Sequence, residues 1–294
     1  MNVLEEGVLL LCCRLGDKLK KPLTLTQFKE LGLRVLGSLI GGNHLTELTA
    51  ADFCRMGYDS KEADRLIDLL DRREQLVSYL SHGESLGIRA VTRISDNYPA
   101  PITKKQITNR PPVLFMMGDE RLLEKPAVAV VGSRDLLPEN EAFARRAGRL
   151  AAEEDLILVS GGARGADTAA QEACLEAGGQ CIVIVPDRLD SCTPKEGILY
   201  ISEDGYDLPF SAARALHRNG LIHMMGERTL AVQCSYQRGG TWQGCTENLK
   251  RGWSELFVFE DGSSAMSALI DLGATGISHL DSFTALQNAQ TSLF

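Results

Sequence analysis

The segment AVAVVGSRDL at residues 127–136 and the segment LILVSGGARGAD at residues 156–167 decide the fold of this chain. Each begins with an apolar, β-branched run typical of a buried parallel strand, and each run ends in a turn of small residues that carries an arginine. An alanine-rich stretch with helical spacing follows each turn, at residues 140–154 and 168–177, and another apolar run follows at residues 181–185. Strand, helix and strand in short alternation predict a doubly wound, mostly parallel α/β sheet.

The two turns have the composition of an anion-binding site. Glycine lets main-chain N–H groups approach an anion, and the start of a helix adds unpaired donors and the positive end of its dipole. Arg134 and Arg164 add charge at the edge where open α/β sheets bind ligands. Two such turns, each with an arginine, favour a phosphate-bearing ligand over glycines that serve only tight turns. Neither turn has the G-x-G-x-x-G or G-x-x-x-x-G-K-[ST] spacing, so a generic NAD or P-loop ATP site is poorly supported.

The first 95 residues are organised differently, as a series of short amphipathic segments. Apolar residues recur at helical spacing in residues 7–15, 26–39, 49–56 and 61–80. They predict a small helical domain that serves in partner contact or dimerisation. Gly41-Gly42-Asn43 is the nearest candidate for a DNA-binding hairpin, but a plain interhelical turn fits it better. The divisions we expect are a helical domain at residues 1–95, an α/β domain at residues 96–276 and a tail at residues 277–294.

The overall charge and the placement of the arginines point in different directions. The chain has 294 residues, 44% of them hydrophobic, and a formal net charge of −8. It can therefore bury a substantial core, but it lacks the basic composition typical of nucleic-acid binders. A local patch can still be basic. Arg134, Arg164, Lys195, Arg218 and Arg238 lie at or just beyond the ends of predicted strands, and we expect them to converge on one face.

Cysteine usage and the start of the chain indicate a reduced, cytoplasmic protein. The eight cysteines form no C-x-x-C pair and have no histidines clustered near them, so neither a zinc site nor a disulfide framework is predicted. The longest early apolar run, at residues 8–13, is too short to cross a bilayer, and no basic segment precedes a long apolar stretch. We therefore expect no membrane association, no metal and no cofactor.

The same residues carry a resemblance to a known family. Residues 128–134, the loop at residues 160–167 and the Gly178-Gly179 pair resemble the DNA-processing protein A (DprA/Smf) family, in the DprA- and LOG-like superfamily of Rossmann domains. The similarity continues in the family's order over roughly residues 98–276. Further matching segments are Tyr98-Pro99, residues 111–115, residues 201–203, Arg218-Asn219, residues 239–241 and residues 269–274.

The resemblance implies an extended Rossmann-like fold, preceded by a SAM-like helical domain and without catalytic residues. Members of the family bind single-stranded DNA in a basic pocket, often as homodimers, protect incoming DNA during natural transformation and load a RecA-type recombinase onto it. On this resemblance, main-chain amides and arginines would hold DNA phosphates. The residues implied in phosphate binding are Gly132, Ser133, Arg134, Ser160, Gly161, Gly162, Ala163, Arg164, Gly165, Lys195, Arg218, Asn219, Gly239, Gly240 and Thr241.

Differences from the family pattern leave two other functions open. Gln171 stands where the family usually has histidine, and Gly220 replaces the second arginine of an Arg-Asn-Arg motif. With the acidic charge, these changes leave room for a domain that senses a small signalling nucleotide. A nucleoside-monophosphate hydrolase of the LOG type is the other alternative. Its Pro-Gly-Gly-x-Gly-Thr-x-x-Glu motif matches poorly, because Arg238 replaces the proline and Glu247 falls one position too far along. A binding protein is therefore favoured over an enzyme.

Four further side chains have both an ordinary and a functional interpretation. Asp167 lies in the first turn of a predicted helix, where an acid usually stabilises the helix dipole, although it could also orient a ribose or a base. Arg218 follows an amphipathic segment, so it is either part of a helix end or a ligand-binding residue. Tyr236 and Trp242 flank the Gly239-Gly240 turn, where they could stack on a base or pack in the protein.

Overall fold

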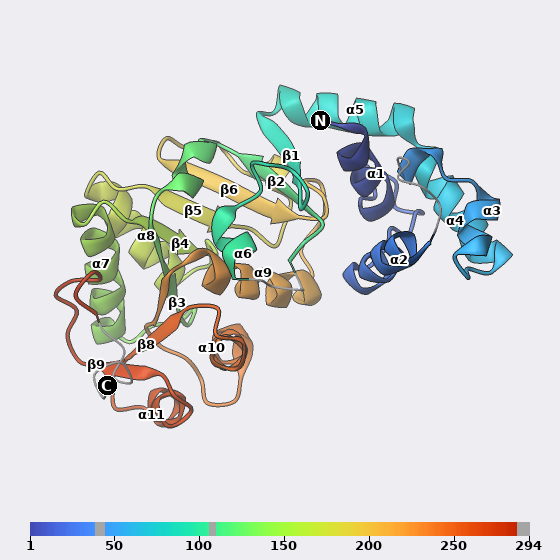
Figure 1. Ribbon diagram of the computed structural model, residues 1–294. Helices are drawn as coiled ribbons and strands as arrows, with labels where there is room; N and C mark the ends of the chain where they lie inside the picture. The colour runs from blue at the N-terminus through green and yellow to red at the C-terminus, as the bar shows by residue number, and fades with distance from the viewer. Residues whose placement is uncertain (39–44, 106–109, 287–294) are drawn as a thin grey trace.

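The apolar runs of the sequence form neighbouring strands of one sheet (Figure 1). Among residues 1–38, 45–105 and 110–286, which the computed structural model describes, the sheet has nine strands in the order β1-β2-β6-β5-β4-β3-β7-β8-β9. The strands are β1 Ile88–Thr92, β2 Val113–Met117, β3 Ala127–Val131, β4 Ile157–Ser160, β5 Cys181–Ile184, β6 Ile198–Glu203, β7 Arg228–Ala231, β8 Glu255–Phe259 and β9 Thr275–Ile277. The strands from β6 to β9 in this order pair in parallel, whereas β1–β2 and β2–β6 are antiparallel. The predicted doubly wound, mostly parallel sheet is confirmed.

The direction of winding reverses at β3. From β3 the chain adds β4, β5 and β6 on one side of the sheet, and after β6 it returns to add β7, β8 and β9 on the other side. Val128 of β3 lies opposite both Leu158 of β4 and Arg228 of β7. The connections beyond the carboxyl ends of β3 and β7 therefore diverge to opposite faces, and they leave a crevice at this switch point.

Helices cover both faces of the sheet because its central strands are buried on both sides. The helices are α6 Ala100–Lys104, α7 Pro138–Glu153, α8 Ala166–Glu176, α9 Ala212–Met225, α10 Gly239–Arg251 and α11 Ser264–Asp271, with 3-10 turns η2 Glu120–Glu124 and η3 Leu189–Ser191. Val128 and Val130 join the core under α7 and α8, whereas Ala127 and Ala129 join the core under α9, α10 and α11. The alternation of side chains along β3 thus supplies two apolar layers.

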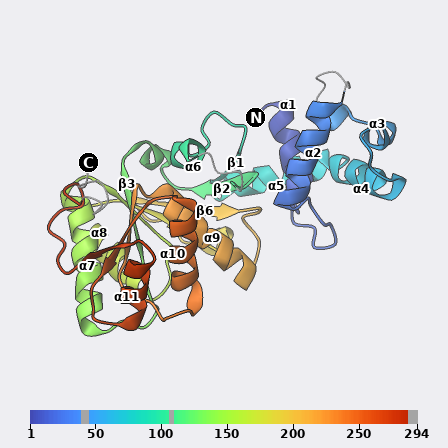
Figure 2. The same ribbon diagram turned by 60° about the horizontal axis from the view of Figure 1, so that its bottom comes forward.

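The amino-terminal region is helical, as its periodicity predicts. Its elements are α1 Val3–Cys12, α2 Leu25–Gly37, η1 Leu45–Glu47, α3 Ala50–Arg55, α4 Ser60–Leu70 and α5 Arg73–Ser85. Figures 1 and 2 show these helices gathered at one end of the molecule, near β1 and β2. The expected boundary between residues 95 and 96 falls after β1, which already belongs to the sheet, and the division into domains stays a prediction. The Gly41-Gly42-Asn43 turn lies outside the described residues.

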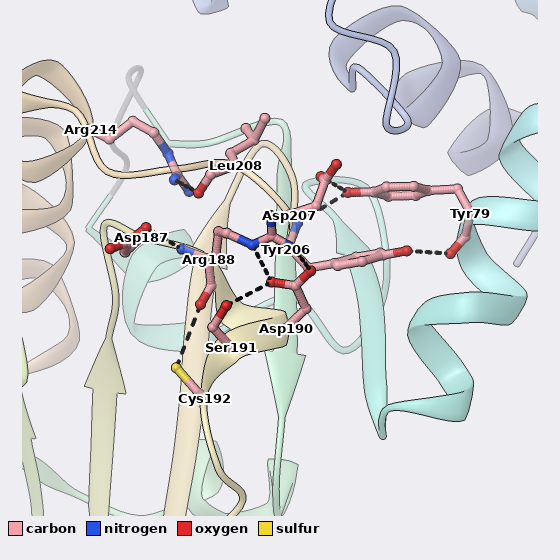
Figure 3. A network of polar contacts seen from close by, with 10 residues as sticks. All are labelled: Tyr79, Asp187, Arg188, Asp190, Ser191, Cys192, Tyr206, Asp207, Leu208 and Arg214. Carbon is pink, nitrogen blue, oxygen red and sulfur yellow. Dashed lines mark hydrogen bonds and ion pairs between the residues drawn. The ribbon is translucent and has the colours of Figure 1, made fainter.

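A tyrosine pair joins the helical region to the sheet (Figure 3). The ring of Tyr79 on α5 stacks on the ring of Tyr206, with 4.2 Å between centroids. The Tyr79 hydroxyl donates a hydrogen bond to Asp207 (2.6 Å), and the Tyr206 hydroxyl donates to the main-chain oxygen of Tyr79 (2.9 Å). Burial raises the pKa of Tyr206 to about 12. These contacts, with Phe115 packed edge-on against both rings, connect α5 to the segment that follows β6.

The described part of the tail packs on α7. Leu280 and Phe283 are buried in the same core as α7. Glu154, at the end of that helix, accepts hydrogen bonds from the main-chain N–H groups of Phe283 and Thr284, both at 2.9 Å. Within the described residues, no helix is both long enough and apolar enough to cross a membrane.

Candidate functional site

A crevice of about 510 Å³ lies at the switch point between β3 and β7. We call it the switch-point crevice. It is lined by the turn after β3, the loop after β4, one side of α9 and the turn that opens α10. Nine residues predicted from the sequence line it, namely Gly132, Ser133, Arg134, Ala163, Arg218, Asn219, Gly239, Gly240 and Thr241.

The turns after β3 and β4 are packed directly against each other. A Cβ atom on Gly132 would lie 2.4 Å from the Cβ atom of Ala166, so only glycine fits there. Gly165 has a φ of +89°, and a Cβ on it would lie 2.3 Å from the main-chain oxygen of Ser133. The Ala166 N–H donates to that same oxygen at 3.1 Å. The small residues of both turns therefore serve a close main-chain contact as well as turn formation.

Asp167 organises the loop after β4 from within. Its Oδ2 atom accepts hydrogen bonds from the N–H groups of Gly161 (3.0 Å) and Ala163 (3.2 Å). Burial raises the pKa of this carboxyl, while the guanidinium of Arg218, 3.9 Å away, lowers it. The dipole interpretation of Asp167 is thus incomplete, since the side chain lies in the first turn of α8 but fixes the loop that precedes it.

Arg218 lies in the interior of α9, so the interpretation of this residue as part of a helix end is wrong. The helix continues to Met225 because the residues after Arg218 are buried against the sheet. Gly220 allows close packing of the Trp253 ring, since a Cβ atom on this residue would lie 3.2 Å from the ring. The Arg218 side chain is only 9% exposed. A Cβ on Gly161 would lie 1.1 Å from its Nη1 atom, so the guanidinium rests against the main chain of Gly161. Its Nε atom is buried and has no hydrogen-bond partner.

The start of α10 forms the third wall of the crevice. Arg238 occupies the N-cap position and makes no side-chain cap, and Gly239 has a φ of +79°. The first N–H groups of α10 are therefore left uncapped beside the crevice. The Thr241 hydroxyl donates to the main-chain oxygen of Gly132 at 2.9 Å, and the Asn219 amide donates to that of Gly240 at 3.2 Å. These two bonds hold the start of α10 against β3 and α9.

The five cations expected to converge do not all meet. Arg134, Arg218 and Arg238 line the switch-point crevice, and Arg134 also lines a neighbouring hollow of about 360 Å³ with Arg164. Arg164 pairs with Asp135 at 2.6 Å on the exposed surface. Lys195 precedes the amino end of β6, whereas the crevice lies at the carboxyl ends of the parallel strands. Lys195 therefore does not reach the crevice. Because β5 and β6 are parallel, the chain has already returned to the amino edge of the sheet when it reaches Lys195, just before β6.

Other predicted residues support the loop after β4 without lining the crevice. The Ser160 hydroxyl accepts a hydrogen bond from the amide of Gln171, the residue that replaces the family's histidine. Gly162, with a φ of +67°, packs its main chain close to Val183 of β5. The sequence analysis did not predict that Asp167 and Gln171 bind the main chain and the Ser160 hydroxyl of this loop. The signal for these contacts was a polar residue in each of the first two turns of a helix that follows a glycine-rich loop.

Aromatic and acidic residues near the crevice bear on the alternatives. Tyr236, half exposed, meets Trp242 edge-on at 5.1 Å between centroids, beside the Gly239-Gly240 turn. Glu247, the acid of the hydrolase alternative, lies within α10, pairs with Arg251 at 2.8 Å and does not line the crevice among the described residues. The exposed ring of Tyr236 therefore lies near the crevice, whereas Glu247, the acid that the hydrolase alternative requires, does not line it.

Comparisons with known proteins agree with the fold and the motifs. A family model described as DNA recombination-mediator protein A matches residues 89–287. DNA processing protein DprA of Streptococcus pneumoniae is 37% identical over 102 residues, which are 35% of this chain and 35% of that protein. Protein Smf of Escherichia coli is 26% identical over 194 residues, covering 62% of this chain and 51% of the relative. The chain thus spans about half or less of the length of these curated relatives.

Solved structures show the same fold. The X-ray structure of DNA processing protein A from S. pneumoniae has a TM-score of 0.66 and 23% identity, covering 87% of this chain and 95% of that one. A structure of DNA processing protein A from Helicobacter pylori, described for its single-stranded DNA binding mode, has a TM-score of 0.55 and 24% identity and covers 65% and 91%. Since the family model spans more than half of the chain, this protein belongs to the DNA recombination-mediator protein A family.

Proposed function

We propose that this protein binds single-stranded DNA in the switch-point crevice and acts as a recombination mediator. The observation that carries the proposal is the arrangement of Arg134, Arg218 and Arg238 around the uncapped start of α10. Family membership supports the choice of DNA as ligand, and the relative from H. pylori is described as binding single-stranded DNA.

The charge inside the crevice supports an anionic ligand despite the net charge of −8. Among the described residues that line it, Asp167 is the one acid, and its Oδ2 atom is engaged by two main-chain N–H groups. Arg134 and Arg238 are exposed and have no ion-pair partner among the described residues. Phosphate neutralisation by such free arginines supplies most of the affinity of nonspecific DNA binders.

The hydrogen-bond pattern narrows the set of candidate phosphate contacts. The N–H groups of Gly161 and Ala163 bind Asp167, and the N–H of Ser133 donates to the main-chain oxygen of Gln233 at 2.9 Å. Those three amides are occupied within the protein. The donors that we assign to phosphate are the uncapped N–H groups at the start of α10, over Gly239, Gly240 and Thr241, together with the arginines. Arg164 lines the neighbouring hollow and would contact DNA that extends beyond the crevice. Lys195 is not part of the proposed site.

Two further roles follow from the same proposal. Tyr236 offers an exposed ring for base stacking, a contact worth about 1–3 kcal/mol per base in single-strand binders. As a mediator, the protein would deliver the strand to a RecA-type recombinase in the cytoplasm, and it would do so as a homodimer whose contacts include the helical region. Pull-down with a purified recombinase and light scattering test these partners.

The proposed function is tested by DNA binding across a salt series. The assay measures fluorescence anisotropy of a labelled 20-nucleotide single strand, with mononucleotides as competitors. We expect tight, salt-dependent binding, and Arg134→Ala with Arg238→Ala should weaken it for all sequences. For two lost phosphate contacts, the slope of log K against log salt should fall by about 1.4.

The matched control is Arg55→Ala with Arg121→Ala, which removes two exposed arginines that do not line the crevice. Equal affinity and equal slope in the wild-type protein and the crevice variant would refute the assignment. Absence of DNA binding, together with a mononucleotide that raises the melting temperature, would favour the nucleotide-sensor alternative.

A further inference from the structure

A second hollow, of about 600 Å³, adjoins the switch-point crevice. We call it the junction pocket, because it lies between the helical region and the α/β part of the chain. Residues 22–25 and Arg14 contribute from the helical region, and the carboxyl end of β6 and the start of α9 contribute from the other side. Phe210 and Arg218 line both hollows. The two hollows are therefore neighbours, separated by these two side chains.

The walls of the junction pocket are mostly apolar and held in place. They include Pro22, Leu23, Pro112, Pro186, Leu208 and Phe210. The guanidinium of Arg214 donates to the main-chain oxygens of Leu208 (2.6 Å) and Pro186 (3.1 Å), as Figure 3 shows for Leu208. The neighbouring Asp207 is bound to Tyr79 of α5. Because the loop after β6 is fixed from both sides, the pocket is preformed, as ligand sites usually are.

Among the residues that the structure describes, two acids line the pocket, Glu203 and Asp204, and burial together with the Glu203 carboxylate raises the pKa of Asp204 to about 6. We assign the selection of the occupant to Glu203. Glu203 is 6% exposed, and its Oε2 atom is hydrogen-bonded to Nδ1 of His217. The carboxylate raises the pKa of His217 to about 9, so the imidazole is protonated at neutral pH. The other oxygen, Oε1, accepts no hydrogen bond from the described residues. It is a fixed acceptor in an apolar-walled pocket, and it favours an occupant that carries hydrogen-bond donors.

Cationic groups flank the pocket where it meets the crevice and the helical region. The Nε atom of Arg218 is buried without a partner, on a side chain that is about nine-tenths buried. Arg14 is exposed on the helical region and has no ion-pair partner among the described residues. Both can neutralise phosphates on either side of an inserted base.

We propose that the junction pocket takes one nucleobase of the bound strand and prefers bases that carry an amino group. The proposal rests on the proposed function, since the strand must first occupy the crevice. Adenine, cytosine and guanine each carry an exocyclic amino donor for the Glu203 carboxylate. Thymine has one donor, N3–H, and the acceptors O2 and O4 on either side of it would face the carboxylate and repel it. The helical region, through Arg14 and Leu23, then takes part directly in strand binding.

The test compares two labelled 20-nucleotide strands that differ in this property, oligo-dC and oligo-dT, at one salt concentration. We expect the wild-type protein to bind oligo-dC about tenfold more tightly, as one hydrogen bond to a charged group can provide. Glu203→Gln should bring the ratio of the two affinities toward one. Its matched control, Glu84→Gln, removes an exposed acid that lines neither hollow and should leave the ratio unchanged.

Arg14→Ala tests the contribution of the helical region. The side chain is exposed, so the variant should fold normally, and we expect it to weaken the binding of both strands several-fold. Lys61→Ala removes an exposed cation of the same region that lines neither hollow, and it should have no effect. If Glu203→Gln fails to fold in a melting experiment, the wild-type ratio and Arg14→Ala still decide the proposal.

The outcomes separate the base pocket from the proposed function. Equal binding of oligo-dC and oligo-dT by the wild-type protein, with no loss in Arg14→Ala, would overturn the base pocket and leave DNA binding in the crevice intact. Absence of binding to either strand would remove the proposed function and the base pocket with it. Displacement of oligo-dC by an equal concentration of dCMP would assign the pocket to a free nucleotide instead of a base of the strand.

Discussion

The loop after β4 and the start of α10 have similar glycine-rich sequences, but they use their main-chain donors in opposite ways. In the loop, the N–H groups of Gly161 and Ala163 are taken by Asp167, which lies buried beside Arg218. At α10, Gly239 and Gly240 start a helix that no side chain caps. The loop is therefore a structural element held by an internal anion, whereas the helix start keeps its donors for an external one.

This contrast shows that a glycine-rich turn after a strand does not by itself mark a ligand-binding turn. The deciding feature is whether an acid of the same turn reaches back to the amides. Asp167 does so in the loop after β4, while the corresponding part of α10 begins Gly239-Gly240-Thr241 and has no acid in its first turn. The function of each turn then depends on which of its main-chain N–H groups have no hydrogen-bond partner within the protein.

Gly161→Ala should have the largest effect, because it puts a methyl group into the internally satisfied loop. The new Cβ would lie 1.1 Å from Nη1 of Arg218 and 2.9 Å from Oδ2 of Asp167. We expect the free energy of unfolding to fall by about 3 kcal/mol or more, since the buried arginine must move away from its carboxylate. Urea denaturation measures the change.

Gly32→Ala is the matched control for that variant. Gly32 lies in α2, and a Cβ there meets nothing within 4 Å, so alanine should stabilise the protein by about 0.5–1 kcal/mol. A Gly161→Ala protein as stable as the wild type would show that the loop is loosely packed and would break the contrast between the two turns.

Gly240→Ala should show the opposite profile, with a small effect on stability and a larger one on binding. Its Cβ would meet only the end of the Asn219 side chain, at 2.7 Å, and that amide can move away. We expect a loss of about 1 kcal/mol or less in stability and a several-fold loss in affinity for single-stranded DNA, because the methyl group stands at the uncapped donors. Denaturation and anisotropy on the same sample separate the two effects; unchanged affinity would argue against phosphate binding at α10.

Thr241→Val tests how the start of α10 is held in place. The variant keeps the shape of the side chain but removes the hydroxyl that donates to the main-chain oxygen of Gly132. Loss of one partly buried hydrogen bond should lower the free energy of unfolding by about 1 kcal/mol. Thr246→Val, which loses only a bond within α10, to Gln243 at the exposed surface, is the control and should change stability less.

The sequence was sufficient to predict the strands of the sheet, but it did not predict which side chains contact one another between the helices. The strand after Pro126 and the strand before the Gly-rich loop were predicted within a residue, because β-branched runs between glycine turns have few other solutions. The roles of Asp167 and Arg218 could not be predicted the same way, since their contact joins α8 to α9. Local capping rules allowed a helix end near Arg218, but burial of the residues that follow overrides those rules.

Lys195 shows a second limit of the sequence. Its assignment to the crevice assumed that it follows a strand end, but the short connection from β5 places it before the next strand instead. Side-chain charge alone does not distinguish the two ends of a parallel strand. The connection length, residues 185–197 with a single 3-10 turn, was the feature that decided its position.

The ionic pair Glu203–His217 extends the contrast to the junction pocket and should give the smallest effect. Like Asp167, Glu203 binds a neighbouring group of the protein, but His217 can lose its charge. Because the carboxylate raises the pKa of His217 to about 9 from the ordinary 6.5, the folded state binds the proton more tightly than the unfolded state does. The stabilisation is complete below about pH 6.5 and is lost as the pH rises through 9.

The difference in unfolding free energy between the wild type and His217→Gln should therefore shrink from pH 6 to pH 9.5. The side chain is half exposed, so the change should stay below about 1 kcal/mol. Taking the difference cancels groups whose pKa does not depend on His217, such as Lys105, whose pKa burial lowers to about 8. Asp204, whose pKa is raised to about 6 by burial, is coupled to His217, and its contribution is complete by about pH 7. His279→Gln, at an exposed position outside both hollows, serves as control. A difference that stays constant across this range would mean that Glu203 does not hold a proton on His217, and its carboxylate would then be free for a ligand at both oxygens.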